Sequence, residues 1–292
     1  AVIEFTSQQG VMGAYYAKAA GEHEDVAIAM SDHYRPRFAG DELPRNIAGC
    51  VVAVADKLDT IAGMFAIDEP PTGSKDPFAL RRSAIGILNI LREKLHIGYE
   101  ELVPVALEAY AEQGIEFDAG AVCASVCAFI KGRLEQMARD EKIDADTVAA
   151  VSAGSVSAPV DYFALAHALK DARDSDADTF DNLATAYARA SHLADADLGV
   201  DVDASLLGDA ERELLQASDA AQAAVDAAFS AKDFTAVIAA LAGLRAPVDR
   251  FFDEVLVMDQ DEALRTNRLR LLNRFEAVFS DVANIGELAR KK

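Results

Sequence analysis

Apolar residues recur at helical spacing along almost the whole chain, and almost no stretch alternates between apolar and polar residues as a strand would. Leucine and alanine dominate these stretches, and prolines such as Pro44, Pro159 and Pro247 fall at the breaks between them. The pattern therefore predicts an all-α protein. The expected helices cover residues 10–20, 23–34, 43–66, 77–95, 99–112, 118–139, 144–152, 159–171, 177–193, 207–229, 233–244, 247–257 and 260–282.

Two places interrupt this helical pattern. Glu112-Gln113-Gly114 ends it in the first half, so we predict two helical modules, at residues 1–112 and 113–292. The stretch 195–203 is acidic and has no periodicity, which is typical of an exposed connection.

The charge of the chain limits the partners it can bind. Its 292 residues carry a formal net charge of −21, which argues against indiscriminate nucleic-acid binding through a broad basic surface. Any anionic partner would have to meet local patches, because positive residues gather in only a few places. No apolar run approaches the length of a membrane span, so no membrane partner is expected. The local patches are Lys75, Arg81 and Arg82, and Arg265, Arg268, Arg270 and Arg274.

Residues 70–82, PPTGSKDPFALRR, contain a Gly-Ser-Lys run beside two arginines, which suggests a phosphate-binding loop. A P-loop needs an earlier glycine and a Lys-Ser or Lys-Thr pair that leads directly into a helix. Here the upstream position is proline, and Lys75 is followed by Asp76 and Pro77. Asp-Pro is typical of a helix start, with Asp76 as the cap and Pro77 at the first helical position. The sequence thus predicts a turn that leads into a helix, without a nucleotide site.

His33 and Asp56 are the residues that most suggest a metal-dependent site. An Asp inside an otherwise apolar helix must be paired or bound to a ligand, because a lone buried carboxylate is costly. A catalytic metal site, however, needs at least three His or carboxylate ligands, and the chain has no His-Asp pair to complete one. We therefore favour a structural carboxylate at Asp56, paired with Lys57 or Arg37, over a metal centre.

The last expected helix, at residues 260–282, carries a cluster of arginines. At 100° per residue, Arg268 lies on the apolar face of this helix, so we expect it to be half-buried against Asp249 or Asp253. Arg270 and Arg274 lie on the opposite face, where they would be free for solvent or phosphate. An arginine pair of this kind is more often simply a solvated face.

Short motifs occur in a fixed order along most of the chain. They are Gln9-Gly10-Val11-Met12-Gly13, His33-Tyr34 with Pro36-Arg37, Ala55-Asp56-Lys57-Leu58-Asp59-Thr60, the stretch 71–82, Asn182-Leu183-Ala184, the stretch 247–258, and Leu264-Arg265 with Asn267-Arg268-Leu269. Taken together they resemble the β subunit of bacterial heterotetrameric glycyl-tRNA synthetase, specifically its C-terminal part. The middle of the chain, about 114–180, matches weakly.

This resemblance implies a particular pair of modules. Residues 1–112 would be the later part of an HD-type helical domain, with His33 and Asp56 as its remnant. Residues 113–292 would be a DALR-type anticodon-binding bundle, named for a motif that Glu262-Ala263-Leu264-Arg265 matches with Glu for Asp. The chain lacks an initiator methionine and begins in an apparently ordered segment, so we expect it to be part of a longer polypeptide.

The resemblance also implies what the chain does. It would bind and position tRNA(Gly) in the cytoplasm, within an α₂β₂ assembly with the glycyl-tRNA synthetase α subunit. Glycine and ATP, with Mg²⁺, would react on that α subunit, so no catalytic residue, metal ligand or cofactor is expected in this chain. The candidate RNA-binding residues are Arg265, Asn267, Arg270, Arg274, Lys75, Arg81 and Arg82.

Two other functions are considered. The first is an HD-type metal-dependent phosphohydrolase, argued from His33 and Asp56. Such an enzyme keeps a His, then a His-Asp pair, then a distant Asp, of which this sequence offers only the last, at Asp56. The second is a purely structural helical scaffold that contacts only protein.

Overall fold

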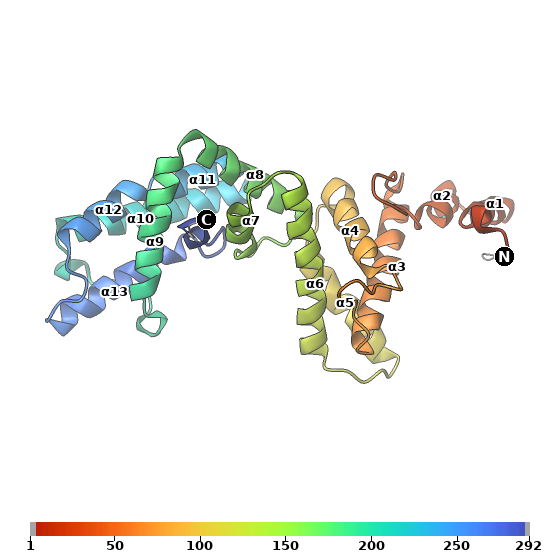
Figure 1. Ribbon diagram of the computed structural model, residues 1–292, viewed down its shortest axis with the longest axis horizontal. Coiled ribbons are helices and arrows are strands. Elements are labelled where there is room, and N and C mark those ends of the chain that lie inside the picture. The colour runs from red at the N-terminus through yellow and green to blue at the C-terminus, as the bar shows by residue number, and fades with distance from the viewer. Residues whose placement is uncertain (1–3, 290–292) are drawn as a thin grey trace. The chain divides into compact units, whose positions relative to one another are not determined.

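The computed structural model describes residues 4–289, and within this part of the chain the regular elements are helices, without a β-strand (Figure 1). The expected all-α fold class is thereby confirmed. Residues 1–3, where the sequence suggested an ordered start, lie outside the described part. Among the helices of residues 4–289, none has the length and apolar composition needed to cross a membrane.

By packing, the chain divides into two compact units, which we describe separately. The first comprises residues 1–137 and 157–160, and the second comprises residues 138–156 and 161–292. This division falls later than residue 112, because the helix that follows residue 112 packs with the first unit: the rings of Phe65 and Phe129 lie 5.4 Å apart. The module border predicted at residue 112 concerns sequence modules and stays a prediction.

In the first unit, one long helix organises the packing. Helix α3 contacts α2, α4 and α5, and α1 packs against α2. Its buried residues recur at helical spacing, and they include Ala53, Leu58 and Ile61. The elements are η1 (Thr6–Gln8), α1 (Val11–Ala19), α2 (Glu24–Asp32), α3 (Ile47–Ala66), α4 (Leu80–Ile90), the π-turn η2 (Leu91–Leu95), α5 (Tyr99–Glu112) and α6 (Ala119–Asp140).

Two polar contacts fix the geometry around α3. Gly63 lets α5 approach closely, since a Cβ there would lie 2.3 Å from the hydroxyl of Tyr110, which donates a hydrogen bond to the carbonyl of Asp59. At the end of α2, the fully buried carboxylate of Asp32 accepts hydrogen bonds from Arg45, with Nε at 2.8 Å. The loop before α3 is therefore fastened to α2.

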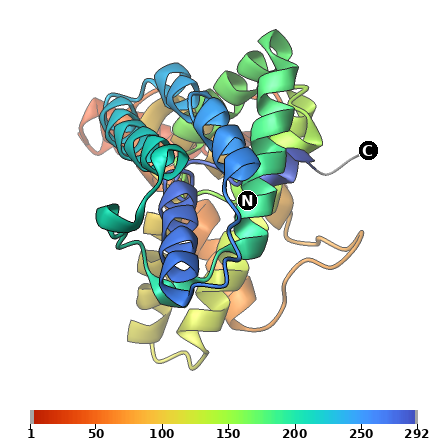
Figure 2. The ribbon, with the colours of Figure 1, turned by 90° about the vertical axis from the view of Figure 1, so that its left-hand side faces the viewer.

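In the second unit, α10 and α9 carry most of the packing. Helix α10 contacts α11, α12 and α13, while α9 contacts α12, α13 and η5, as can be followed in Figure 2. The aromatic rings of Tyr187, Phe275 and Phe279 form the centre of the α9–α13 contact. The elements are α7 (Ala145–Ser152), α8 (Pro159–Ser175), α9 (Ala177–Leu193), η3 (Ala196–Leu198), η4 (Ala204–Leu206), α10 (Asp209–Ser230), α11 (Phe234–Ala242), α12 (Arg245–Glu254), α13 (Glu262–Ala277) and η5 (Ile285–Ala289).

One expected helix start is wrong. Helix α4 begins at Leu80 and not at Pro77, because residues 76–79 form a turn closed by a hydrogen bond from the Ala79 N–H to the Asp76 carbonyl. Ala79 then adopts a left-handed conformation with φ of 55°. The capping role expected of Asp76 is present all the same: its carboxylate accepts from the N–H groups of Leu80, at 2.8 Å, and Arg81, at 3.1 Å.

Candidate nucleic-acid interface

Arg268 on α13 is the centre of a partly buried group of ion pairs, and its place on the apolar face of the helix predicted this partial burial. Only 14% of its side chain is exposed, and its guanidinium donates to Glu211 at 2.6 Å and to Asp259 at 2.7 Å. Burial alone would lower the pKa of Arg268, but these two carboxylates outweigh it and raise the pKa. The expected partners, Asp249 and Asp253, are wrong. Both belong to α12, whereas Glu211 belongs to α10 and Asp259 to the segment before α13.

The same guanidinium shapes the segment that leads into α13. Nη1 of Arg268 donates to the carbonyl of Leu256 at 2.9 Å, and Asp261 caps α13 by accepting from the N–H of Ala263 at 2.8 Å. Arg265 adds a bond from Nη1 to the carbonyl of Asp259 at 2.9 Å. Residues 255–261 are thus held against α13 by side chains of that helix and of its cap.

Two asparagines of α13 anchor the acidic connection that follows α9. Asn267 is 3% exposed; its amide donates to the Asp203 carbonyl at 3.0 Å and accepts from the Asp203 N–H at 2.7 Å. Asn273 donates to the carbonyls of Asp195, at 2.7 Å, and Gly199, at 2.8 Å. Asn267, one of the candidate RNA-binding residues, therefore has its amide engaged within the protein.

Arg270 and Arg274 do not point freely into solvent, so this part of the expectation is wrong. Arg270 donates from Nε to the carbonyl of Leu198 at 3.0 Å, and Arg274 donates from Nε to Asp219 of α10 at 2.5 Å. Both side chains are half-buried, because neighbouring elements cover the face that the helical wheel showed as open. Their roles as RNA contacts stay predictions.

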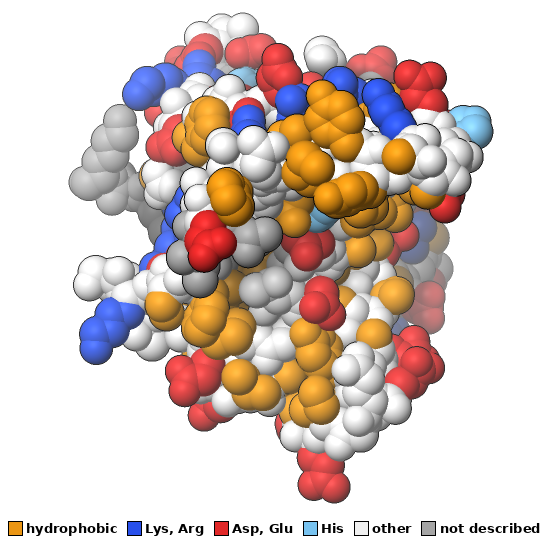
Figure 3. Space-filling view, turned by 90° about the vertical axis from the view of Figure 1, so that its right-hand side faces the viewer, with side chains coloured by type: hydrophobic (Ala, Val, Ile, Leu, Met, Phe, Trp, Pro, Cys, Tyr) orange, Lys and Arg blue, Asp and Glu red, His pale blue; other side chains and the backbone are white. Residues whose placement is uncertain are grey.

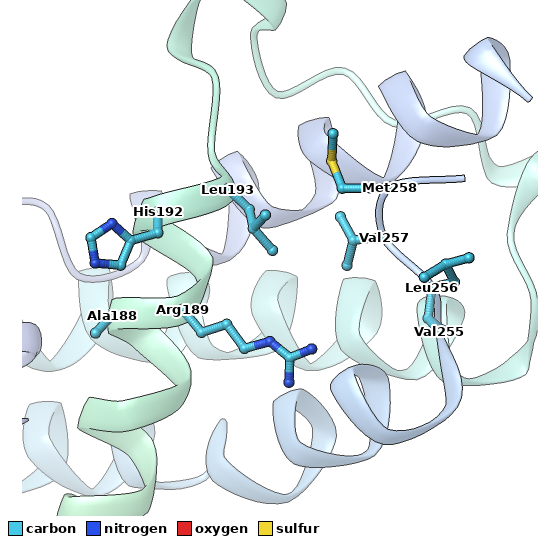
Figure 4. Close-up of a pocket in the computed structure, with 8 residues that line it drawn as sticks. All are labelled: Ala188, Arg189, His192, Leu193, Val255, Leu256, Val257 and Met258. Carbon is cyan, nitrogen blue, oxygen red and sulfur yellow. The ribbon is translucent and has the colours of Figure 1, made fainter. Parts of the chain in front are cut away.

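A groove that the sequence did not suggest lies beside these residues. Its walls are the last turns of α9 and the segment Val255–Met258, and its volume is about 510 Å³. Figure 4 shows Arg189 reaching from α9 toward this segment, while the ring of His192 lies at the rim and is turned away in that view. A second hollow shares His192, Leu193 and Met258 with the groove and continues it toward residues 194–197. The groove therefore runs past the end of α9.

The chemistry of this groove suits a flat, unsaturated ring. Leu256 and Met258 are 71% and 56% exposed, which leaves apolar surface open on the wall. The guanidinium carbon of Arg189 lies 4.2 Å from the ring centre of Phe252, a cation–π contact that holds the planar cation in place. The sequence predicted that residues 255–257 end a helix, whereas α12 ends at Glu254 and this apolar run forms a wall of the groove. Nothing in the sequence marked Arg189 as part of a site.

Of the three candidates of the first unit, Lys75 and Arg81 lie at the 72–76 turn, whereas Arg82 lies beside Arg37. Thr72 and Lys75 close the turn through two backbone hydrogen bonds, of 3.1 and 2.7 Å. Lys75 is exposed, whereas Arg81 is half-buried and donates to the Gly73 carbonyl at 2.9 Å. Arg82 is exposed and its guanidinium lies 3.5 Å from the carbonyl of Arg37. Lys75 and Arg82 thus remain available to an anion.

The pairing of Asp56 with Lys57 or Arg37 that the sequence suggested is wrong. The buried charged residue of α3 is Lys57, next to Asp56 in the chain. Asp56 is exposed, while Lys57 is buried and donates to the carbonyl of His33 at 3.0 Å. Burial lowers the pKa of Lys57. The His33 ring binds the carbonyl of Ala29 at 3.1 Å, and within residues 4–289 no group of three or more His, Cys, Asp or Glu side chains is arranged to hold a metal ion.

Comparison with known proteins agrees with the resemblance. Residues 1–153 match the family model described as glycyl-tRNA synthetase beta subunit, and residues 183–285 match the model of the DALR anticodon binding domain. The HD-like character of residues 1–112 stays a prediction.

Glycine–tRNA ligase beta subunits of Acinetobacter baylyi, Aeromonas hydrophila and Haemophilus influenzae are 41%, 44% and 42% identical to the chain. Each alignment covers 98% of the chain, and 41%, 41% and 42% of the respective relative. The chain thus spans about two fifths of the length of these curated relatives. On this evidence, the chain belongs to the glycyl-tRNA synthetase beta subunit family.

Proposed function

We propose that this chain is a tRNA-binding part of a glycine–tRNA ligase beta subunit, and that it positions tRNA(Gly) for glycylation in the cytoplasm. The observation that carries the proposal is a coincidence of position. The DALR anticodon binding domain match covers residues 183–285, and both walls of the groove, residues 188–193 and 255–258, fall within that range.

The groove would receive an unstacked base of the tRNA. Sequence-specific recognition of RNA targets bases in single-stranded loops, which stack on aromatic side chains or on guanidinium planes. Arg189 offers such a plane, and the exposed side chains of Leu256 and Met258 offer an apolar wall. The net charge of −21 opposes indiscriminate RNA binding over a broad surface, so RNA would have to meet local patches of the chain.

The proposal places catalysis on a separate subunit. We propose that the chain assembles with an α subunit as α₂β₂, and that glycine, ATP and Mg²⁺ react there. The loop that most resembles a phosphate cradle fits ATP poorly, since the carboxylate of Asp76 already occupies the N–H groups of Leu80 and Arg81. An anion at that helix start would have to displace a carboxylate from its hydrogen bonds.

Binding of tRNA to the groove can be measured directly. Fluorescence anisotropy with labelled tRNA(Gly) and with a non-cognate tRNA, over a range of salt concentrations, should show tighter binding of tRNA(Gly). Arg189→Gln and Met258→Ala should each weaken binding of tRNA(Gly), on the order of tenfold, as loss of one stacking surface does.

A matched control is Arg212→Gln on α10. Arg212 is exposed, and its substitution removes the same charge outside the groove. It should leave the affinity for tRNA(Gly) within about twofold, because a single exposed charge that contacts no phosphate of the RNA contributes little. Equal affinity of the Arg189 and Met258 variants and the unchanged chain, with the fold intact, would place the anticodon elsewhere.

A further inference from the structure

Two exposed phenylalanines, Phe38 and Phe78, lie on two loops of the first unit that both adjoin α4. Phe38 is 57% exposed and Phe78 is 56% exposed. Single exposed apolar residues are common on protein surfaces, so exposure alone indicates nothing. Figure 3 shows more generally that hydrophobic and basic side chains lie side by side on the face turned toward the viewer. What distinguishes these two phenylalanines is the set of groups beside them.

The loops that carry Phe38 and Phe78 both border the first turns of α4. Pro36 packs on α4, since a Cβ at Gly86 would lie 3.4 Å from its Cγ. One helical turn earlier, the guanidinium of Arg82 lies 3.5 Å from the carbonyl of Arg37. Residues 36–38 therefore run alongside the start of α4, which residues 76–79 lead into.

The charges between the two loops are not balanced. Arg37 is paired with Asp41 at 2.9 Å and lies over the Phe38 ring, with 5.8 Å to its centroid. The carboxylate of Asp76 is occupied by backbone N–H groups. In the described part of the chain, Lys75 and Arg82 make no ion pair, so two cations remain uncompensated in a chain of net charge −21.

We propose that Phe38, Lys75, Phe78 and Arg82 form a second RNA-binding surface, which takes a single-stranded segment of RNA. Aromatic faces that stack on bases, with cations that meet the phosphates between them, are the combination that binds single strands. A duplex offers phosphates but keeps its bases stacked inside, so it would leave the phenylalanines unused. The proposal rests on the proposed function only in that RNA is the ligand.

The test uses a labelled single-stranded RNA of about 12 nucleotides, long enough to span one site, and the same sequence annealed to its complement. The whole chain should bind the single strand more tightly than the duplex. Phe78→Ala should weaken binding of the single strand on the order of tenfold, since each stacked base contributes about that much. Lys75→Gln with Arg82→Gln should reduce the salt slope of log K by about 1.4, or about 0.7 for each lost phosphate contact.

Matched variants separate a local effect from a change in net charge. Lys18→Gln with Lys142→Gln removes two exposed lysines elsewhere, and Phe5→Ala removes another exposed phenylalanine. These controls should keep both affinity and salt slope. Equal binding of the single strand by the Phe78 variant and the unchanged chain, or tighter binding of the duplex, would overturn the proposal and favour a protein partner for this surface.

Failure of this proposal is distinguishable from failure of the proposed function. The same variants are measured with tRNA(Gly), in parallel with Arg189→Gln. Arg189→Gln could weaken binding of tRNA(Gly) while the Phe78 and Lys75/Arg82 variants bind both tRNA(Gly) and the single strand as the unchanged chain does. That result would support the groove of the second unit as an RNA site and refute the surface at Phe38 and Phe78.

Discussion

Substitution of Arg268 by alanine tests how the second unit is held together. The side chain of Glu211, its partner on α10, is only 5% exposed, so the variant leaves a buried carboxylate without its cation. Breaking a buried ion pair from one side typically costs about 3–5 kcal/mol, because the remaining charge is uncompensated. Asp259, the second partner, is 29% exposed and can be hydrated, so most of the loss should come from Glu211. We expect Arg268→Ala to lower the free energy of unfolding by about 3–5 kcal/mol.

The assay is urea unfolding of the whole chain followed by circular dichroism, with the midpoint of the transition that contains the second unit as the readout. The control is Arg212→Ala, an exposed arginine of α10 that lies 3.5 Å from Asp209 and should cost about 0.5 kcal/mol or less.

A double-mutant cycle isolates the pair from other effects of truncation. Glu211→Gln removes the charge that Arg268→Ala would leave unpaired, so the double variant should be destabilised by clearly less than the sum of the single variants. Additive losses, or a loss of less than about 1 kcal/mol in Arg268→Ala, would refute the reasoning.

Three further predictions concern other parts of the fold. Burial would raise the pKa of Asp32, but hydrogen bonds from Arg45 outweigh it and lower the pKa to about 2. About 2 kcal/mol of stability should therefore be present above about pH 4, the unfolded pKa, and be lost as the pH falls toward 2. Unfolding of the chain and of Asp32→Asn over a pH series checks this, and a stability difference between the two that does not change with pH would contradict it. Asn267→Ala should cost about 1–3 kcal/mol, because the N–H and carbonyl of Asp203 lose their partner, and hydrogen exchange should show faster exchange at residues 199–206. Burial raises the pKa of Cys127 to about 12, so its alkylation by iodoacetamide at neutral pH, followed by mass spectrometry, should be far slower than that of a free cysteine; rapid labelling would show that the thiol is not shielded.

The helical fold was predictable because its evidence is local. Apolar spacing of 3.6 residues and the placement of prolines are properties of each segment, and they suffice for the existence of the helices. The start of α4 was less predictable, because Asp-Pro fits a turn as well as a first helical turn. The carboxylate of Asp76 reaches forward to the N–H groups of Leu80 and Arg81, so a short turn fits between the cap and the helix.

The buried charge of α3 could have been found from the sequence, since the signal was present. Cys50, Ala53, Val54, Leu58 and Ile61 define the buried face at helical spacing, and Lys57 falls on that face while Asp56 does not. Attention to the type of residue, a carboxylate near a histidine, led to the wrong member of the pair. Residue spacing was the better guide here than chemical type.

The partners of Arg268 were beyond the reach of the sequence for a different reason. Helical spacing predicts which face of α13 is buried, but it does not tell which distant segment covers that face. Asp249 and Asp253 were near in the chain, whereas Glu211 lies 57 residues before Arg268 and reaches it only because α10 packs on α13. This distant pairing also bears on the groove, since the same guanidinium holds the carbonyl of Leu256 in the groove wall. Arg268 therefore links the stability of the second unit to the shape of the site, and a change there should affect RNA binding without Arg268 contacting RNA.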